Sequence, residues 1–166
     1  MIIEIVGVSR GNSPNRALLL NDLAEVGRSH SDATVMLHSA IAQRFDLTAT
    51  DLKALGFLDR LGALTAGEIA QHTGLATASV TSLIDRLEKR GFVRRTRDQK
   101  DRRKVFVEID REATAPIAQI FEKFGKYFQP LYAGFDVDAL EIILTFLRRA
   151  QECAHKLTKE ISSKEA

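Results

Sequence analysis

Apolar side chains recur every three or four positions along most of the chain, which is typical of amphipathic helices. A first helix is predicted to start at Ser13 and Pro14, because serine is a favourable N-cap and proline suits the first helical position. The apolar pattern continues to Phe45, and it leaves open whether the stretch 27–31 divides this region into two helices. Another helix is predicted from Thr48, with leucines at near-helical spacing.

Two shorter helices are predicted next. Thr65 and Glu68 form the sequence T-x-x-E, a capping box in which each side chain can accept a hydrogen bond from the other residue's backbone N–H. A helix therefore begins at this pair, and Gly74 is placed to end it in a tight turn. A second helix is predicted from about 76 to 90, and Gly91 is placed to end it in a left-handed conformation.

The helical period is lost beyond that glycine. Phe92–Arg97 and Val105–Ile109 are predicted to be two short strands, because apolar and other residues alternate in the second of them. The polar loop 98–104 joins them into a hairpin. Two helices joined by a tight turn and followed at once by a hairpin predict a winged helix-turn-helix.

Two long helices are predicted at the end of the chain. The first starts between Asp110 and Pro116, and Pro130 should end or kink it. The second has Asp136 as its N-cap and carries an apolar stripe as far as Ile161, about seven turns. Packing on its own domain is one use for this stripe. Because other long apolar helices also need cover, a homodimer is the favoured interpretation.

These elements predict a mainly α fold with a small β-hairpin wing. Residues 47–110 are expected to form a winged helix-turn-helix DNA-binding domain. Residues 1–46 are expected to supply an N-terminal arm and a dimerisation helix or helices, and residues 111–166 the C-terminal dimerisation helices.

Charge is distributed unevenly along the chain. Residues 86–104 contain ten Lys or Arg and three Asp or Glu, a net charge of +7, whereas the rest contains 14 basic and 19 acidic residues, a net charge of −5. Such a concentration is expected of a surface that binds phosphates, with a solvated charged loop as the alternative. Its place in the predicted hairpin, and in the helix before it, favours double-stranded DNA as the partner.

The predicted 76–90 helix has a polar face of small side chains. Such a face lets a helix enter the major groove, about 12 Å wide, where hydroxyls can bond phosphates or base edges and threonine methyls can touch thymine. The candidate DNA contacts on this helix are Thr77, Ser79, Thr81, Ser82 and Arg86. The candidate contacts in the basic hairpin are Arg95, Arg97, Lys100, Arg102, Arg103 and Lys104.

Several short motifs occur in a fixed order in this region. They are Glu68-Ile69-Ala70, Gly74-Leu75, the run Ile84-Asp85-Arg86-Leu87-Glu88-Lys89-Arg90-Gly91 and the hairpin pattern Asp98-x-x-Asp101-Arg102-Arg103. With them the chain resembles the MarR family of bacterial transcription regulators, most closely over about residues 45–110. One departure is Ala76, which stands where the family often has a capping serine and leaves Thr77 as the alternative cap. Another is the lack of Arg or Lys in the first two turns of the recognition helix, so long bidentate base contacts are not expected there.

The resemblance implies a homodimer with interlocking terminal helices, in which each subunit offers a winged helix to half of a pseudo-palindromic operator. Two-fold symmetry then places the recognition helices ~34 Å apart. It also implies that Arg103 enters the minor groove, where a guanidinium matches the negative potential of narrow A·T-rich tracts. Asp101 would hold the wing or orient Arg103 without touching DNA.

The resemblance also implies a small aromatic or phenolic effector, bound between the dimer helices and the winged helix. The expected function is therefore that of a ligand-responsive repressor. By their order along the chain, His38, Phe45 and Phe57 fall in the effector region, although core packing is the favoured role of the two phenylalanines.

Other function classes have weaker support. The sequence has no Gly-rich phosphate loop, no G-x-S-x-G and no H-E-x-x-H, so an enzyme is not expected. No cofactor or metal is expected either, since the four histidines are scattered without ligand spacing. The alternative function is a winged helix that contacts RNA or protein without sequence-specific DNA binding. No segment is long and apolar enough to span a bilayer, so the expected location is cytoplasmic, with no membrane partner.

Overall fold

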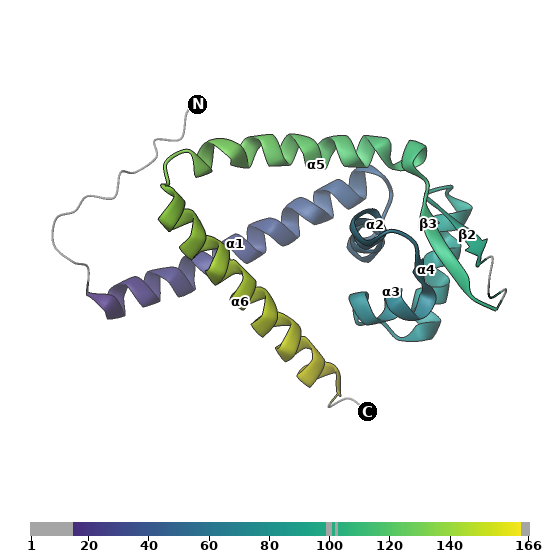
Figure 1. Ribbon diagram of the computed structural model, residues 1–166, viewed down its shortest axis with the longest axis horizontal. Helices are drawn as coiled ribbons and strands as arrows, with labels where there is room; N and C mark the ends of the chain where they lie inside the picture. The colour runs from purple at the N-terminus through teal and green to yellow at the C-terminus, as the bar shows by residue number, and fades with distance from the viewer. Residues whose placement is uncertain (1–14, 99–100, 102, 164–166) are drawn as a thin grey trace. The chain divides into compact units, whose positions relative to one another are not determined.

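The computed structural model of the protein describes residues 15–98, 101 and 103–163 and divides the chain into two compact units, one ending at Ala49 and the other beginning at Thr50. The first unit consists mainly of α1 (Arg16–Arg44), a single helix of 29 residues (Figure 1). The stretch 27–31 stays helical, because one glycine costs only about 1 kcal/mol in a helix of this length.

The start of α1 differs from the prediction. The side chain of Asn15 caps the helix by accepting a hydrogen bond from the backbone N–H of Ala17 at 3.0 Å. The helix therefore begins at Arg16 and not at the proline, because an asparagine side chain satisfies one of the first unpaired N–H groups. The predicted cap Ser13 and Pro14 lie outside the described residues.

The winged helix-turn-helix forms as predicted, with element ends shifted by a residue or two. Its elements are α2 (Ala49–Leu61), β1 (Leu64–Thr65), α3 (Ala66–Thr73), α4 (Thr77–Lys89), β2 (Val93–Arg97) and β3 (Val105–Ile109). The capping box at Thr65 is present, and Gly74 and Gly91 adopt φ of 73° and 75°, as a left-handed helix end requires.

Strand β1 was not expected from the sequence. The three strands are antiparallel in the order β1-β3-β2, with Leu64 opposite Val107 and Val93 opposite Ile109. Two residues are too few to show an alternating pattern. What makes β1 a strand is its pairing with β3, through which the side chain of Leu64 becomes buried.

The core of the second unit joins all these elements. Its most deeply buried apolar side chains include those of Leu55, Leu58, Ile69, Val80, Ile84, Leu87 and Val107, each at most 3% exposed. They come from α2, α3, α4 and β3. Helix α4, the predicted recognition helix, therefore packs into this core through its own apolar stripe. Its opposite face is left in solvent.

Two long helices complete the chain, as predicted. In α5 (Arg111–Tyr132), Asp110 is the N-cap and accepts hydrogen bonds from the N–H groups of Glu112 and Ala113, while Pro130 lies in the last turn. In α6 (Val137–Ser163), Asp136 accepts a hydrogen bond from the N–H of Ala139 at 2.9 Å. Among the described residues, no helix is long and apolar enough to cross a membrane.

The long helices leave many large apolar side chains exposed in the single chain. On α1 they are Leu18, Leu19, Leu20, Leu23, Val26, Val35 and Met36, and on α6 Val137, Ile142, Leu144, Phe146, Leu147, Leu157 and Ile161. Contiguous apolar surfaces of this kind commonly mark protein–protein interfaces.

Candidate nucleic-acid interface

Short-range contacts fix both ends of α3, the helix that precedes the turn into α4. Thr65 Oγ1 accepts from the N–H of Glu68 at 3.3 Å, and the Glu68 carboxylate accepts from the N–H of Thr65 at 2.7 Å. These bonds, first of all the one from the Thr65 backbone, lower the pKa of Glu68. At the other end of α3, Gly74 reverses the chain and Leu75 is half-buried behind the turn. The bounds of α3, and the place where the chain turns into α4, are therefore set by residues close together in the sequence.

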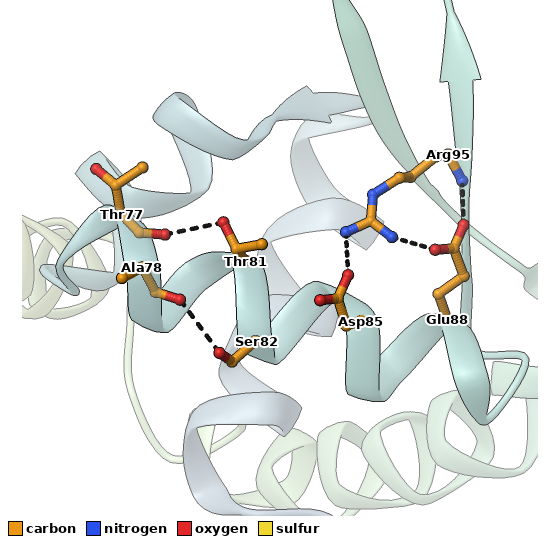
Figure 2. A network of polar contacts seen from close by, with 7 residues as sticks. All are labelled: Thr77, Ala78, Thr81, Ser82, Asp85, Glu88 and Arg95. Carbon is orange, nitrogen blue, oxygen red and sulfur yellow. Dashed lines mark hydrogen bonds and ion pairs between the residues drawn. The ribbon is translucent and has the colours of Figure 1, made fainter.

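The predicted contact residues at the start of α4 lie on its solvent face. Thr77, Ser79, Thr81 and Ser82 are all exposed. The hydroxyl of Thr81 donates to the carbonyl oxygen of Thr77 at 3.1 Å, and that of Ser82 donates to the carbonyl oxygen of Ala78 at 3.3 Å (Figure 2). Ala76 is the N-cap and makes no side-chain capping bond, so Thr77 is the first helical residue and does not serve as the cap.

Arg86 is held by a partner that was not foreseen. Its Nε and Nη2 donate to the two carboxylate oxygens of Asp51 on α2, at 3.1 and 2.5 Å. Asp51 is 1% exposed, whereas the Arg86 side chain is 46% exposed. The hydrogen bond to Asp51 raises the pKa of Arg86. The pair therefore ties the recognition helix to α2 through a buried carboxylate.

Arg95 is likewise engaged inside the protein. From β2 it reaches two acidic residues of α4: its guanidinium pairs with Asp85 at 2.5 Å and with Glu88, and its backbone N–H donates to Glu88 at 3.1 Å (Figure 2). The hydrogen bond to Asp85 is the main cause of the raised pKa of Arg95. This bridge fixes the base of the wing against the recognition helix.

The remaining described wing residues face solvent. Arg97, Arg103 and Lys104 are exposed, while Lys100 and Arg102 lie outside the described residues. The carboxylate of Asp101 accepts a hydrogen bond from the backbone N–H of Arg103 at 3.1 Å. This contact is the kind expected of a residue that holds the wing next to Arg103.

The structure divides the basic cluster into two sets. Arg86, Arg94 and Arg95 are paired with carboxylates of the protein, those of Asp51, of Glu108 and of Asp85 with Glu88. Arg97, Arg103 and Lys104 project into solvent from the hairpin. Lys89 and Arg90, at the end of α4, are also exposed, so the solvent-facing cations among the described residues of this region lie at the end of α4 and on the outer wing.

Sequence reasoning missed the acidic partners, although one signal was present. Asp51 stands four and seven positions before Leu55 and Leu58, which places it on the buried face of α2. A buried carboxylate needs a partner, and the arginine of α4 was a candidate for it.

Comparisons with known proteins agree with this geometry. The family model described as the MarR family matches residues 47–105. The chain is also 36% identical over 138 residues to the uncharacterized HTH-type transcriptional regulator YcgE of Bacillus subtilis (strain 168), covering 83% of this chain and 90% of YcgE. This chain belongs to the MarR family. It is therefore a DNA-binding transcription regulator by family and not an enzyme.

Solved MarR-family structures share the fold. A MarR family protein from Bacillus stearothermophilus aligns with a TM-score of 0.66 and 22% identity, over 83% of this chain and 96% of its own. A MarR variant from E. coli, solved with operator DNA, aligns with a TM-score of 0.56 and 20% identity over 82% and 98%. NadR, solved with 4-hydroxyphenylacetate, aligns with a TM-score of 0.59 and 20% identity over 86% and 94%.

Proposed function

We propose that this MarR-family chain is a ligand-responsive repressor that binds a pseudo-palindromic operator as a homodimer. The observation that carries the proposal is the exposed small polar face of α4 beside a hairpin from which Arg97, Arg103 and Lys104 project. The helix fits the major groove, and the wing cations reach phosphates or the minor groove. Arg95 contributes by holding the wing to α4, since Asp85 and Glu88 already occupy its guanidinium.

The dimer would be built by α1, α5 and α6. Among the described residues, the leucines at the start of α1 and the stripe from Ile142 to Ile161 on α6 are exposed. Burying them against a second copy is favourable at roughly 25 cal/mol per Å² of apolar surface. A two-fold dimer also presents two recognition helices, as a pseudo-palindromic site requires.

The effector would bind in a cavity of about 310 Å³ between α2 and α5. Its walls include Leu52, Leu55, Ile117 and Phe121, and Arg60 lies at its edge. Apolar walls suit an aromatic ring, and Arg60 would pair with its acid group, with the carboxylate of Asp59 also in the lining. The neighbour NadR was solved with an aromatic acid, 4-hydroxyphenylacetate.

Helix α2 would transmit the effector's presence to DNA. It supplies one wall of the cavity through Leu52 and Leu55, and Asp51, the residue before Leu52, holds Arg86 of α4. A ligand that shifts α2 would therefore turn the recognition helix. It would release DNA only to the extent that it prefers the shifted form.

The test is a binding titration of the full chain against duplex DNA obtained by selection from a random pool, with an RNA of the same length as comparison. The three exposed wing cations among the described residues of each of two subunits would neutralise roughly six phosphates, which gives a slope of log K against log salt of about −5 or steeper. Equal affinity for RNA and for any DNA would instead favour the alternative, a winged helix for RNA or protein contacts. Light scattering gives the subunit number, with Leu144→Glu expected to yield monomers.

The effector proposal has its own assay. 4-Hydroxyphenylacetate serves as the probe, and release of the selected duplex is measured at fixed salt. Arg60→Met should weaken the response to this acid, whereas Lys53→Met, on an exposed position of the same helix outside the cavity, should not. The proposed location is the cytoplasm, because a repressor must reach its operator.

A further inference from the structure

The solvent face of α4 offers hydrogen-bond acceptors where DNA readout often uses donors. This face presents the adjacent residues Thr81 and Ser82, and Asp85 lies one turn further on, four residues after Thr81 and three after Ser82 (Figure 2). All residues of α4 are described, and none from Thr77 to Asp85 has a side-chain nitrogen.

The hydroxyl hydrogens at the centre of this face are already used. Thr81 donates its hydroxyl hydrogen to the carbonyl of Thr77, and Ser82 donates its own to the carbonyl of Ala78. A hydroxyl has one hydrogen and two lone pairs, so each oxygen is left as an acceptor. Thr81 also carries a methyl group on the same exposed side chain.

The carboxylate of Asp85 extends the acceptor face by one turn. Its side chain is 60% exposed although Arg95 pairs with one of its oxygens. A carboxylate is repelled by guanine N7 and O6, which are acceptors, and can only accept from base amino groups.

Arg86, the residue after Asp85, can supply donors only from the outer Nη1 end of its guanidinium without giving up its contact with Asp51. Its Nε–Nη2 edge lies on Asp51, whose carboxylate is 1% exposed. Turning this edge toward a guanine would leave a buried carboxylate without its cation, which is strongly unfavourable.

We propose that Thr81 and Ser82 are specificity-determining residues that read A·T base pairs in the major groove. This rests on the proposed function, since it assumes that α4 enters that groove. The acceptor oxygens would take a hydrogen bond from adenine N6, and the Thr81 methyl would contact the thymine methyl. Because cytosine N4 is also an amino donor, the methyl contact is what favours A·T over G·C. Guanine is not read under this part of the helix.

The test uses the full chain and its selected duplex, with single bases replaced by analogues at A·T positions of each half-site. Purine in place of adenine removes the N6 amino group, and deoxyuridine in place of thymidine removes the methyl. Each is expected to weaken binding roughly fivefold at one position of each half-site. 7-Deazaadenine, which lacks only the N7 acceptor, should bind like the parent duplex.

Two matched variants separate the oxygen from the methyl. Thr81→Val keeps the shape and a methyl but has no acceptor, so it should lose the preference for adenine over purine and keep that for thymine over uracil. Thr81→Ser keeps the acceptor and loses the methyl, so it should show the reverse. Ser82→Ala should lose an adenine preference at a neighbouring position. Unchanged melting temperature and unchanged affinity for non-specific duplex show that these variants are folded and still dock on DNA.

The outcomes distinguish this inference from the proposed function. Duplex binding with the expected salt slope, but with no effect of purine or deoxyuridine, overturns the readout and leaves the regulator intact. Loss of binding with 7-deazaguanine in the half-site would show that a donor reads guanine there, and would also overturn it. If the chain shows no preference for duplex DNA over RNA, the proposed function fails, and the readout fails with it.

Discussion

The pair of Arg86 and Asp51 gives the sharpest prediction about stability. Arg86→Met keeps most of the length of the side chain and removes the guanidinium, so it leaves a carboxylate that is 1% exposed without its cation. Breaking a buried ion pair in this way typically costs about 3–5 kcal/mol. Because the Arg86 side chain is 46% exposed and water can enter where it was, we expect the lower end, about 3 kcal/mol.

A double-mutant cycle separates the contribution of the ion pair from that of each side chain. Asp51→Asn removes the buried charge but keeps a hydrogen-bonding group, so we expect a cost of about 1 kcal/mol. In the Asp51→Asn background, Arg86→Met strands no buried charge, and its further cost should fall to about 1 kcal/mol or less. The double-mutant cycle should therefore give a coupling energy of about 2 kcal/mol.

The assay is urea unfolding followed by circular dichroism, at one protomer concentration for all variants, because the stability of a dimer depends on concentration. In thermal scans, 3 kcal/mol corresponds to a shift of roughly 6–12 °C for a chain of this size. Arg111→Met, whose partner Asp59 is 3.6 Å away and exposed, is a matched control and should change stability by less than about 1 kcal/mol. An Arg86→Met variant as stable as this control, or additive single changes, would refute the structural role of the pair.

Further predictions concern the wing and the caps. Arg103→Ala should weaken duplex binding severely and reduce the salt slope by about 1 per subunit, because an exposed cation is lost, while the dimer stays folded by light scattering. Arg95→Met should weaken binding to all duplex sequences alike, because the charges of Asp85 and Glu88 lose their partner and repel phosphates. If the melting temperature and the DNA affinity of this variant both match those of the parent protein, the bridge to α4 has no role. Thr65→Ala should cost about 1 kcal/mol in urea unfolding, and a cost near zero would contradict the capping box. The folded-state pKa of Glu68 is lowered, so its contribution to stability is present above its ordinary pKa of 4.5 and is lost as pH falls through the lower folded value. Glu68→Gln should remove this part of the loss of stability in acid. A stability-against-pH profile identical to that of the parent protein would argue against this role.

Local chemistry determined much of the fold. The T-x-x-E capping box, Gly74 and Gly91 are short-range signals, because their hydrogen bonds and backbone angles involve neighbours within a few residues. Apolar residues at helical spacing placed α4, and the alternation after Gly91 placed the hairpin. For this reason the winged helix and the MarR family could be predicted from the sequence, and the matches to the family model and to YcgE confirmed them.

Two features of the fold were not predicted correctly from the sequence, strand β1 and the N-cap of α1. Strand β1 exists only because β3 pairs with it, and a two-residue stretch carries no pattern of its own. Asn15 caps α1 two residues beyond the predicted Ser13, and serine and asparagine have similar N-cap preferences, so propensity does not choose between them.

The amino-acid sequence by itself determined that this region is basic, helical and built to dock on DNA. Only the tertiary structure decided which charges remain for DNA. Asp51 is 35 residues from Arg86, and Asp85 and Glu88 lie on a different element from Arg95, yet folding brings each pair into contact. A charge count treats all arginines alike. The buried carboxylate of Asp51 must be paired, which holds Arg86 in the scaffold, whereas Arg95 meets the more exposed carboxylates of Asp85 and Glu88 only because the hairpin packs beside α4.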